Sequence, residues 1–186
     1  MADQSIVILL GGESKRMGRD KAFVDWKGKT FLNHLYQELS AYNRNIFLSV
    51  NQNQYDHLHE RYPCILDEEP KKGPLVAIFS AVKKLKGEIL FFAVDMPESH
   101  YLHNQLSEQK GNTCFQLDGR IHPLPLKMNS NSLESLKAHL TEGNLSILSY
   151  IGFGRFNILS SENQNYFLNV NSLKSVQRTY RFNSRS

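Results

Sequence analysis

Residues 6–21, which read IVILLGGESKRMGRDK, contain the pattern that decides the fold. Residues 6–10 are all apolar, which is typical of a strand buried on both faces in the middle of a parallel sheet. A polar loop with three glycines follows directly at residues 11–20. In open parallel sheets, ligands bind outside the carboxyl ends of the strands. The stretch therefore predicts an α/β protein whose first strand ends at a ligand site.

The rest of the chain alternates short apolar runs with helical patterns, which is also typical of α/β architecture. We expect further strands at residues 46–50, 64–66, 89–94, 113–117, 121–128 and 166–170. We expect helices after Thr30, from Gly73-Pro74, around 102–106, around 133–140 and after Asn171. Thr30 can cap a helix, and Pro74 suits a first helical turn. Residues 143–164 have no readable pattern.

Length and composition favour an ordinary globular chain. The 186 residues, of which 40% are hydrophobic and 22% charged, fit a single domain over residues 1–186 with a frayed, basic C-terminal end. No apolar run reaches the ~18 residues that span a bilayer, and the start does not resemble a signal peptide. Cys64 and Cys114 lack the spacing of metal ligands, so we expect a cytoplasmic protein with reduced thiols.

The net charge of +4 and the pI of about 9.0 are compatible with two kinds of partner. A basic surface attracts nucleic acid, but it equally attracts a small phosphorylated substrate. The chain lacks a basic helix with interleaved aromatic residues, so the nucleic-acid interpretation is the weaker one. We expect neither nucleic acid nor a membrane as a partner.

Four polar features lie at the expected carboxyl ends of strands. These are the loop that begins at Gly11, then Asn51, Asp67 and Asp95. Because parallel strands end at the same edge of a sheet, segments that are distant in sequence should converge there. This convergence is a stronger indication of a site than any single motif.

The loop has the chemistry of a phosphate-binding segment. Gly11, Gly12 and Gly18 let the backbone approach a ligand closely, and successive N–H groups can then face anionic oxygens. Arg16 offers a planar fork for phosphate and Lys21 a point charge. A glycine turn with solvated charges would look similar. The patterns GxxxxGK[ST] and GxGxxG are both absent, which removes the main support for ATPase and dinucleotide-oxidoreductase functions.

Asp95 follows six apolar residues and is a candidate Mg²⁺ ligand, since Mg²⁺ often takes one or two carboxylates together with substrate phosphates. A turn-capping role is the alternative. Asp67 is either a nucleotide contact or a solvated carboxylate. His122 is expected to be packed rather than to bind metal, and no arrangement of residues supports a hydrolase triad.

Residues 9–22, LLGGESKRMGRDKA, resemble the signature LAGGxSxRMGxDKA of the molybdenum cofactor guanylyltransferases. The resemblance continues in order along nearly the whole chain. It includes Asn51, Asp67, the GPL at 73–75, the DMP at 95–97, the HP at 122–123 and the NVN at 169–171. Such co-linearity is far more specific than any one piece.

The resemblance implies a three-layer α/β/α Rossmann-like nucleotidyltransferase fold with a mostly parallel central sheet. It implies transfer of GMP from GTP to the terminal phosphate of molybdopterin, with or without molybdenum, and release of pyrophosphate. Molybdoenzymes or their chaperones would receive the product. The implied GTP contacts are Leu9, Leu10, Gly11, Gly12, Lys21, Asn51, Asp67 and Asp95. Asp95 would also hold Mg²⁺, and Arg16, Lys21 and Asp95 would be the catalytic residues.

The sequence departs from the family pattern in three places. Leu10 stands where alanine is usual, GNLSIL at 143–148 replaces a stretch that often carries arginine, and the usual Pro-Glu after the NVN is missing. Alternatives therefore remain: transfer from CTP, transfer to a sugar phosphate, or a non-catalytic nucleotide-binding regulator. Competition between GTP, CTP and ATP, and pyrophosphate release, would distinguish them.

Overall fold

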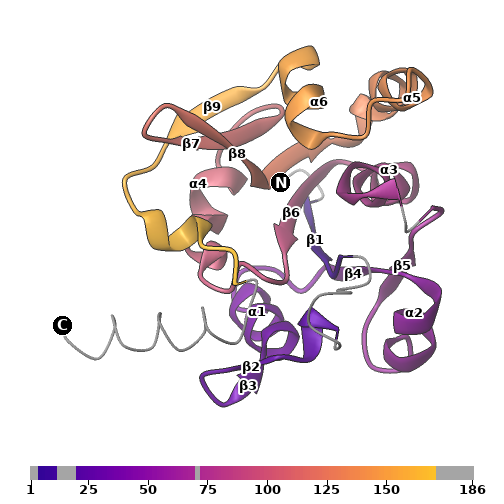
Figure 1. The fold of residues 1–186 in the computed structure, drawn as a ribbon, viewed down its shortest axis with the longest axis vertical. Coiled ribbons are helices and arrows are strands. Elements are labelled where there is room, and N and C mark those ends of the chain that lie inside the picture. The colour runs from indigo at the N-terminus through magenta and orange to yellow at the C-terminus, as the bar shows by residue number, and fades with distance from the viewer. Residues whose placement is uncertain (1–3, 12–19, 70–71, 171–186) are drawn as a thin grey trace.

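The central element is a seven-stranded sheet with the order β5-β4-β1-β6-β8-β7-β9 (Figure 1). The computed structural model describes residues 4–11, 20–69 and 72–170. Four neighbouring strands, β5, β4, β1 and β6, run parallel, and β8 pairs antiparallel with both β6 and β7. The predicted α/β class with a mostly parallel sheet is therefore confirmed.

The strands of the main sheet are β1 (Gln4–Leu9), β4 (Ile46–Val50), β5 (Cys64–Leu66), β6 (Glu88–Ala93), β7 (Thr113–Leu117), β8 (Arg120–Asn129) and β9 (Asn157–Ser160). The short strands β2 (Asp25–Trp26) and β3 (Lys29–Thr30) form a separate hairpin. The α-helices are α1 (Phe31–Ser40), α2 (Gln52–Leu58), α3 (Pro74–Lys84), α4 (His103–Ser107), α5 (Leu133–Thr141) and α6 (Ile147–Phe153).

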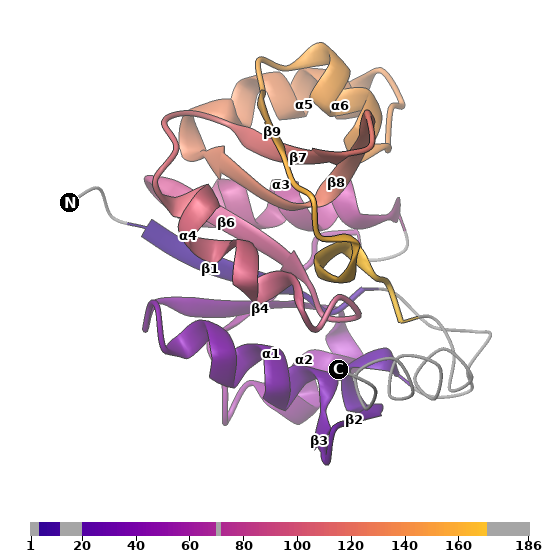
Figure 2. The ribbon, with the colours of Figure 1, turned by 90° about the vertical axis from the view of Figure 1, so that its left-hand side faces the viewer.

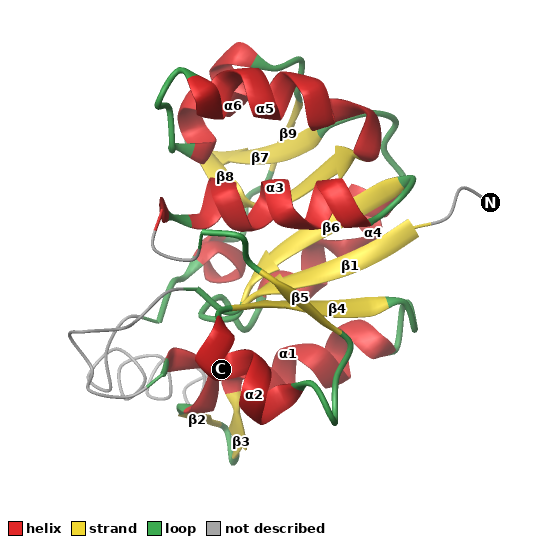
Figure 3. Cartoon of the chain, turned by 90° about the vertical axis from the view of Figure 1, so that its right-hand side faces the viewer, coloured by secondary structure: helices red, strands yellow, loops and turns green. Residues whose placement is uncertain are grey.

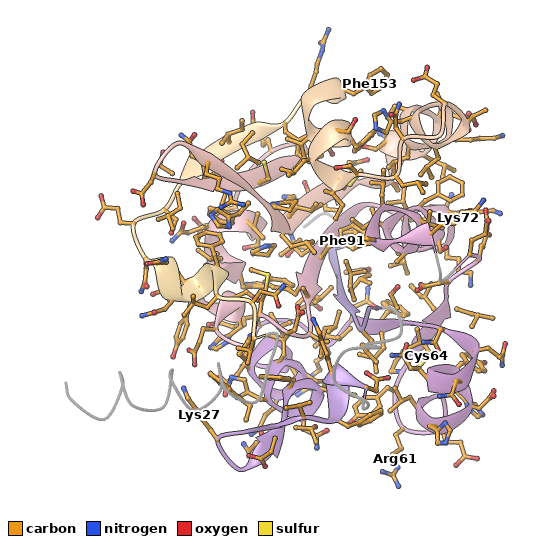
Figure 4. All side chains as sticks on the ribbon, in the orientation of Figure 1. Lys27, Arg61, Cys64, Lys72, Phe91 and Phe153 are labelled. Atoms are coloured by element: carbon orange, nitrogen blue, oxygen red, sulfur yellow. The ribbon has the colours of Figure 1, made fainter. Side chains whose placement is uncertain are left out.

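Helices cover both faces of the sheet because its strands are apolar on both faces. Along β1, Ile6 and Ile8 pack with residues of α1, α2 and α4, whereas Val7 and Leu9 pack with residues of α3, α5 and α6. Figure 3 shows the two helical layers on either side of the strands. Phe91 on β6 is fully buried in the second of these cores (Figure 4). The result is the three-layer α/β/α arrangement.

Local sequence signals set several boundaries as predicted. Thr30 caps α1, and its hydroxyl accepts a hydrogen bond from the Asn33 backbone N–H at 3.1 Å. Pro74 occupies the first turn of α3 after Gly73, whose φ of +95° favours glycine. Asp118 and Gly119 both have positive φ and close the β7–β8 hairpin, as expected for an Asp-Gly turn.

The expected strand at residues 166–170 is wrong. A 3₁₀ helix, Gln164–Phe167, covers its first two residues, and residues 168–170 are irregular. Asn163 caps the 3₁₀ helix by accepting a hydrogen bond from the Asn165 N–H. The last strand in the described part of the chain is β9, which lies in the stretch without a readable pattern and pairs parallel with β7 as an outermost strand of the sheet. Its residues are mostly exposed, so no apolar run marks it.

Two helices of seven residues each, α2 and α6, were not predicted. So short a helix shows its apolar period barely twice. In the part of the chain that the structure describes, no helix is long and apolar enough to cross a membrane.

Candidate functional site

The carboxyl ends of the four parallel strands bring the predicted site residues to one edge of the sheet. Gly11 lies just beyond β1, Asn51 directly follows β4, Asp67 directly follows β5, and Asp95 lies just beyond β6. These strands are neighbours in the sheet, and their registers align Leu9 with both Ser49 and Ala93. The expected convergence of distant segments is therefore present.

Lys21 and Asp95 form the centre of this edge. The ammonium Nζ of Lys21 lies 2.7 Å from Oδ2 of Asp95, across 74 positions of sequence. The two side chains are only 24% and 14% exposed, so the pair is shielded from bulk solvent on most sides but remains accessible. A cation and a carboxylate in contact at a strand edge can receive a triphosphate and its metal ion together.

The position of Lys21 is fixed by a short 3₁₀ helix, Lys21–Phe23, at the end of the glycine loop. Asp20 caps this helix, with its Oδ1 accepting a hydrogen bond from the Ala22 N–H at 3.0 Å. The other carboxylate oxygen of Asp20 accepts a hydrogen bond from Nε2 of Gln54 at 2.6 Å. The segment that carries Lys21 is thus attached to helix α2.

Gln54 links three parts of the site, although its side chain is buried. Its Nε2 also donates to the Gly11 carbonyl at 3.5 Å, and its Oε1 accepts from the Asn51 N–H at 3.0 Å. Asn51 returns the interaction, since its side chain accepts from the Gln54 N–H at 3.0 Å in a capping box. Gln54 therefore joins both described flanks of the glycine loop, Gly11 and Asp20, to the end of β4.

Sequence reasoning missed Gln54 and the structural role of Asp20. A signal for Gln54 was present, because Asn51 and Gln54 have the N-x-x-Q spacing of a capping box. That pattern would also have predicted α2. The contacts of Gln54 with Gly11 and Asp20 join segments that are 43 and 34 positions away, and no local pattern reveals them.

We expect Gln54→Ala to lower the free energy of unfolding by about 1–3 kcal/mol, because it leaves buried polar groups without their partners. Gln52→Ala is the matched control, since Gln52 is an exposed residue of the same helix that bonds only to Asp56 among the contacts described. Urea denaturation followed by circular dichroism measures both. Equal effects of the two substitutions would contradict a special role for Gln54.

Asp67 is a half-buried carboxyl group at the end of β5. Burial raises its pKa from 3.8 to about 6, while the Ser49 hydroxyl, which donates to Oδ1, and the charge of Lys84 act in the opposite direction. Its backbone N–H donates to the Val50 carbonyl, which holds it beside the end of β4. Asp67 is thus a carboxyl group that changes its charge near neutral pH.

The remaining predicted site residues differ in which of their atoms a ligand could contact. The side chains of Leu9 and Leu10 are buried in the two cores, so a ligand could meet only their backbone. Gly11 has a φ of +79°, and no atom of the described residues lies within 4 Å of the position of a Cβ atom there. Gly12 and Arg16 lie outside the described residues.

His122 lies on β8, the strand that pairs antiparallel with β6. It packs against Phe167 with ring centroids 4.4 Å apart, as the sequence predicted for a packed histidine. Within the described ranges, no group of three or more His, Cys, Asp or Glu side chains is arranged to hold a metal ion. A single carboxylate, Asp95, is nevertheless a suitable donor for Mg²⁺ when substrate phosphates and waters complete the shell.

Comparison with known proteins points to nucleotidyltransferases, in agreement with the geometry of the site. The family model "MobA-like NTP transferase domain" matches residues 6–152. The chain is 30% identical to a molybdenum cofactor guanylyltransferase of Photobacterium profundum over 94% of both chains. It is 27% identical to a protein of that name from Haemophilus influenzae, over 94% of this chain and 96% of the relative.

Solved structures share the fold at lower sequence identity. The molybdopterin-guanine dinucleotide biosynthesis protein A of Archaeoglobus fulgidus matches with a TM-score of 0.75 at 19% identity, over 98% of this chain and all of the other. A 4-diphosphocytidyl-2C-methyl-D-erythritol synthase of Anaerococcus prevotii matches with a TM-score of 0.74 at 11% identity, over 97% and 96% of the two chains. The family model covers most of the chain, and the P. profundum relative matches it at nearly full length. The chain therefore belongs to the MobA-like NTP transferase family.

Proposed function

We propose that this protein transfers GMP from GTP to the terminal phosphate of molybdopterin, with or without molybdenum, and releases pyrophosphate. The observation that carries the proposal is the contact between Lys21 and Asp95 at the edge where Gly11, Asn51 and Asp67 also lie. The names of the relatives, which are guanylyltransferases of the molybdenum cofactor, support GTP and molybdopterin as the substrates. The product would pass to molybdoenzymes or their chaperones.

The reaction requires no general base. A terminal phosphate oxygen of the acceptor is already anionic near neutral pH and attacks the α-phosphorus of GTP in line. A new P–O bond forms, and the bond between the α-phosphorus and the bridging oxygen breaks, so that pyrophosphate leaves with the electron pair. This chain contributes positioning and electrostatic stabilisation, as is general for such transfers.

Each residue of the site has a distinct part in this proposal. Lys21 would bind triphosphate oxygens and stabilise the leaving pyrophosphate, together with Arg16 from the glycine loop. Asp95 would hold Mg²⁺, which when bound neutralises part of the charge on the phosphates. Gly11 and Gly12 would let their backbone approach the nucleotide, while Asn51 and Asp67 would contact its nucleoside end, beside the backbone of Leu9 and Leu10.

The affinity for GTP should depend on the charge of Asp67. A carboxylate accepts hydrogen bonds from the N–H groups of guanine, whereas a protonated carboxyl accepts fewer. Because the pKa of Asp67 is about 6, we expect the affinity to rise as the pH is raised through 6. Calorimetric titrations from pH 5 to 8 measure this dependence. Asp67→Asn is the control, because the titration of GTP itself affects both proteins equally. Identical pH profiles of GTP affinity in the two proteins would refute the role of Asp67.

The function is tested by incubating the protein with GTP, Mg²⁺ and molybdopterin, followed by mass analysis of the product. We expect a guanine dinucleotide of molybdopterin and one pyrophosphate for each product. GTP, CTP and ATP in competition would identify the preferred nucleotide. Binding of GTP without any pyrophosphate release would instead support a regulator, and efficient use of CTP would assign a different transferase.

A further inference from the structure

A cavity of about 230 Å³ lies beside Asp95, and the proposed GTP contacts do not use it. Three segments form its walls: the β2–β3 hairpin, the loop that follows Asp95, and the chain after β9. Figure 2 shows the chain after β9 running back from the edge of the sheet toward α1 and the hairpin. The lining includes Trp26, Glu98, Tyr101, Asn165, Tyr166 and Val170.

Two observations place the cavity close to Asp95 in the structure. Pro97 and Glu98 belong to its wall and follow Asp95 by two and three residues. On the opposite wall, the Val170 N–H donates a hydrogen bond to the carbonyl of Asp95 at 2.8 Å. A molecule in the cavity would therefore lie close to the backbone of Asp95, whose side chain we assign to the metal.

The order of the sheet separates the cavity from the proposed nucleoside contacts. The strand β6, which leads to Asp95, has β1, β4 and β5 on one side and β8, β7 and β9 on the other. Asn51 and Asp67 follow β4 and β5, whereas residues 163–170 of the cavity wall follow β9. Asp95 thus stands between two sites, as transfer between a donor and an acceptor requires.

The side chains of the cavity are suited to a flat, polar heterocycle. The rings of Tyr101 and Tyr166 have their centroids 5.3 Å apart at 32°, and Trp26 adds a third aromatic wall. Tyr101 is 53% exposed, so one aromatic face remains accessible for stacking. Stacking alone accepts many ring systems, so specificity requires a polar group.

Glu98 supplies that polar group. Its side chain is only 17% exposed, and its Oε1 lies 2.6 Å from Nζ of Lys27. Figure 4 labels Lys27 on the hairpin that borders this region. A carboxylate pairs well with two adjacent N–H donors, such as the ring N–H and amino group of a 2-amino-4-oxopyrimidine edge.

We propose that this cavity binds the pterin ring of the acceptor, with Glu98 accepting hydrogen bonds from its 2-amino-4-oxopyrimidine edge and Tyr101 and Tyr166 contacting its face. The inference rests on the proposed function. Guanine has the same edge, so GTP is the second possible source of this chemistry. The position of Asn51 and Asp67 on the other side of Asp95 assigns guanine there and the pterin here.

Steady-state kinetics of guanylyl transfer distinguish the two rings. We expect Glu98→Gln and Tyr101→Ala each to raise the KM for molybdopterin by about tenfold, the effect of losing one charged hydrogen bond or one stacking contact. The KM for GTP should change less than twofold. Glu134→Gln, on the distant helix α5, is the control that should leave both values nearly unchanged.

Two outcomes of these kinetics overturn the inference. If Glu98→Gln raises the KM for GTP instead, the cavity holds guanine, and if neither KM changes, it holds neither ring. If the unmodified protein transfers no guanylyl group, the proposed function fails separately. The cavity is then tested by quenching of free pterin fluorescence, where binding that Glu98→Gln weakens supports it and binding that is absent or unaffected excludes it.

Discussion

Asp95→Ala is expected to lower kcat for guanylyl transfer at least ~10³-fold, because a bound metal ion contributes several kcal/mol to charge stabilisation in phosphoryl transfer. The fold should remain intact. The pair with Lys21 remains accessible to water, so water can solvate the ammonium once the carboxylate is removed. The backbone carbonyl of residue 95, which accepts from Val170, is retained in the variant.

The measurement is pyrophosphate release under saturating GTP, Mg²⁺ and molybdopterin, with thermal unfolding as the check on the fold. Asp95→Asn is the second variant, since it keeps the shape of the side chain and loses the charge. Both substitutions should reduce turnover to a similar extent. Full activity in either variant, with Mg²⁺ still required, would exclude Asp95 as the metal ligand.

Lys21→Ala is expected to weaken binding of GTP by roughly 10- to 100-fold, which corresponds to the ~1.5–3 kcal/mol of a hydrogen bond to a charged group. Removing this ammonium takes away a cation that would contact the triphosphate and help to stabilise pyrophosphate as it leaves. The effect on kcat/KM should therefore exceed the effect on GTP affinity alone. Calorimetry and initial rates measure the two quantities.

Lys29→Ala is the matched control for Lys21. Lys29 is an exposed lysine of the adjacent hairpin whose Nζ donates to Gln37 at 2.6 Å. Its removal should leave the affinity for GTP nearly unchanged, because screened surface charges contribute little. If the two variants lost affinity equally, the effect would reflect net charge rather than the position of Lys21.

The predictable part of the fold has long or strongly marked signals. The apolar runs of β1 and β6, the Thr30 cap and the Asp118-Gly119 turn all led to the correct elements because local chemistry fixes them. The 3₁₀ helix at Gln164–Phe167 was mistaken for a strand, since its partners come from distant segments. Tyr166, for example, contacts Tyr101 from the 3₁₀ helix Ser99–Leu102, which follows β6.

The same distinction between local sequence signals and long-range packing separates the predictable part of the site from the rest. The positions of Asn51, Asp67 and Asp95 at strand ends follow from apolar runs that stop at a polar residue, and the family resemblance added their chemistry. The 2.7 Å contact between Lys21 and Asp95 and the bridge through Gln54 depend on how segments pack. The cavity at Glu98 is less predictable still, because its walls come from three separate parts of the chain.

The most direct test of the account is a crystal structure with Mg²⁺ and a GTP analogue whose α,β-bridging oxygen is replaced by a methylene group. We predict Mg²⁺ at about 2.0–2.1 Å from a carboxylate oxygen of Asp95, with Nζ of Lys21 on an oxygen of the same triphosphate. A nucleotide bound elsewhere, or a metal ion that Asp95 does not contact, would contradict the account.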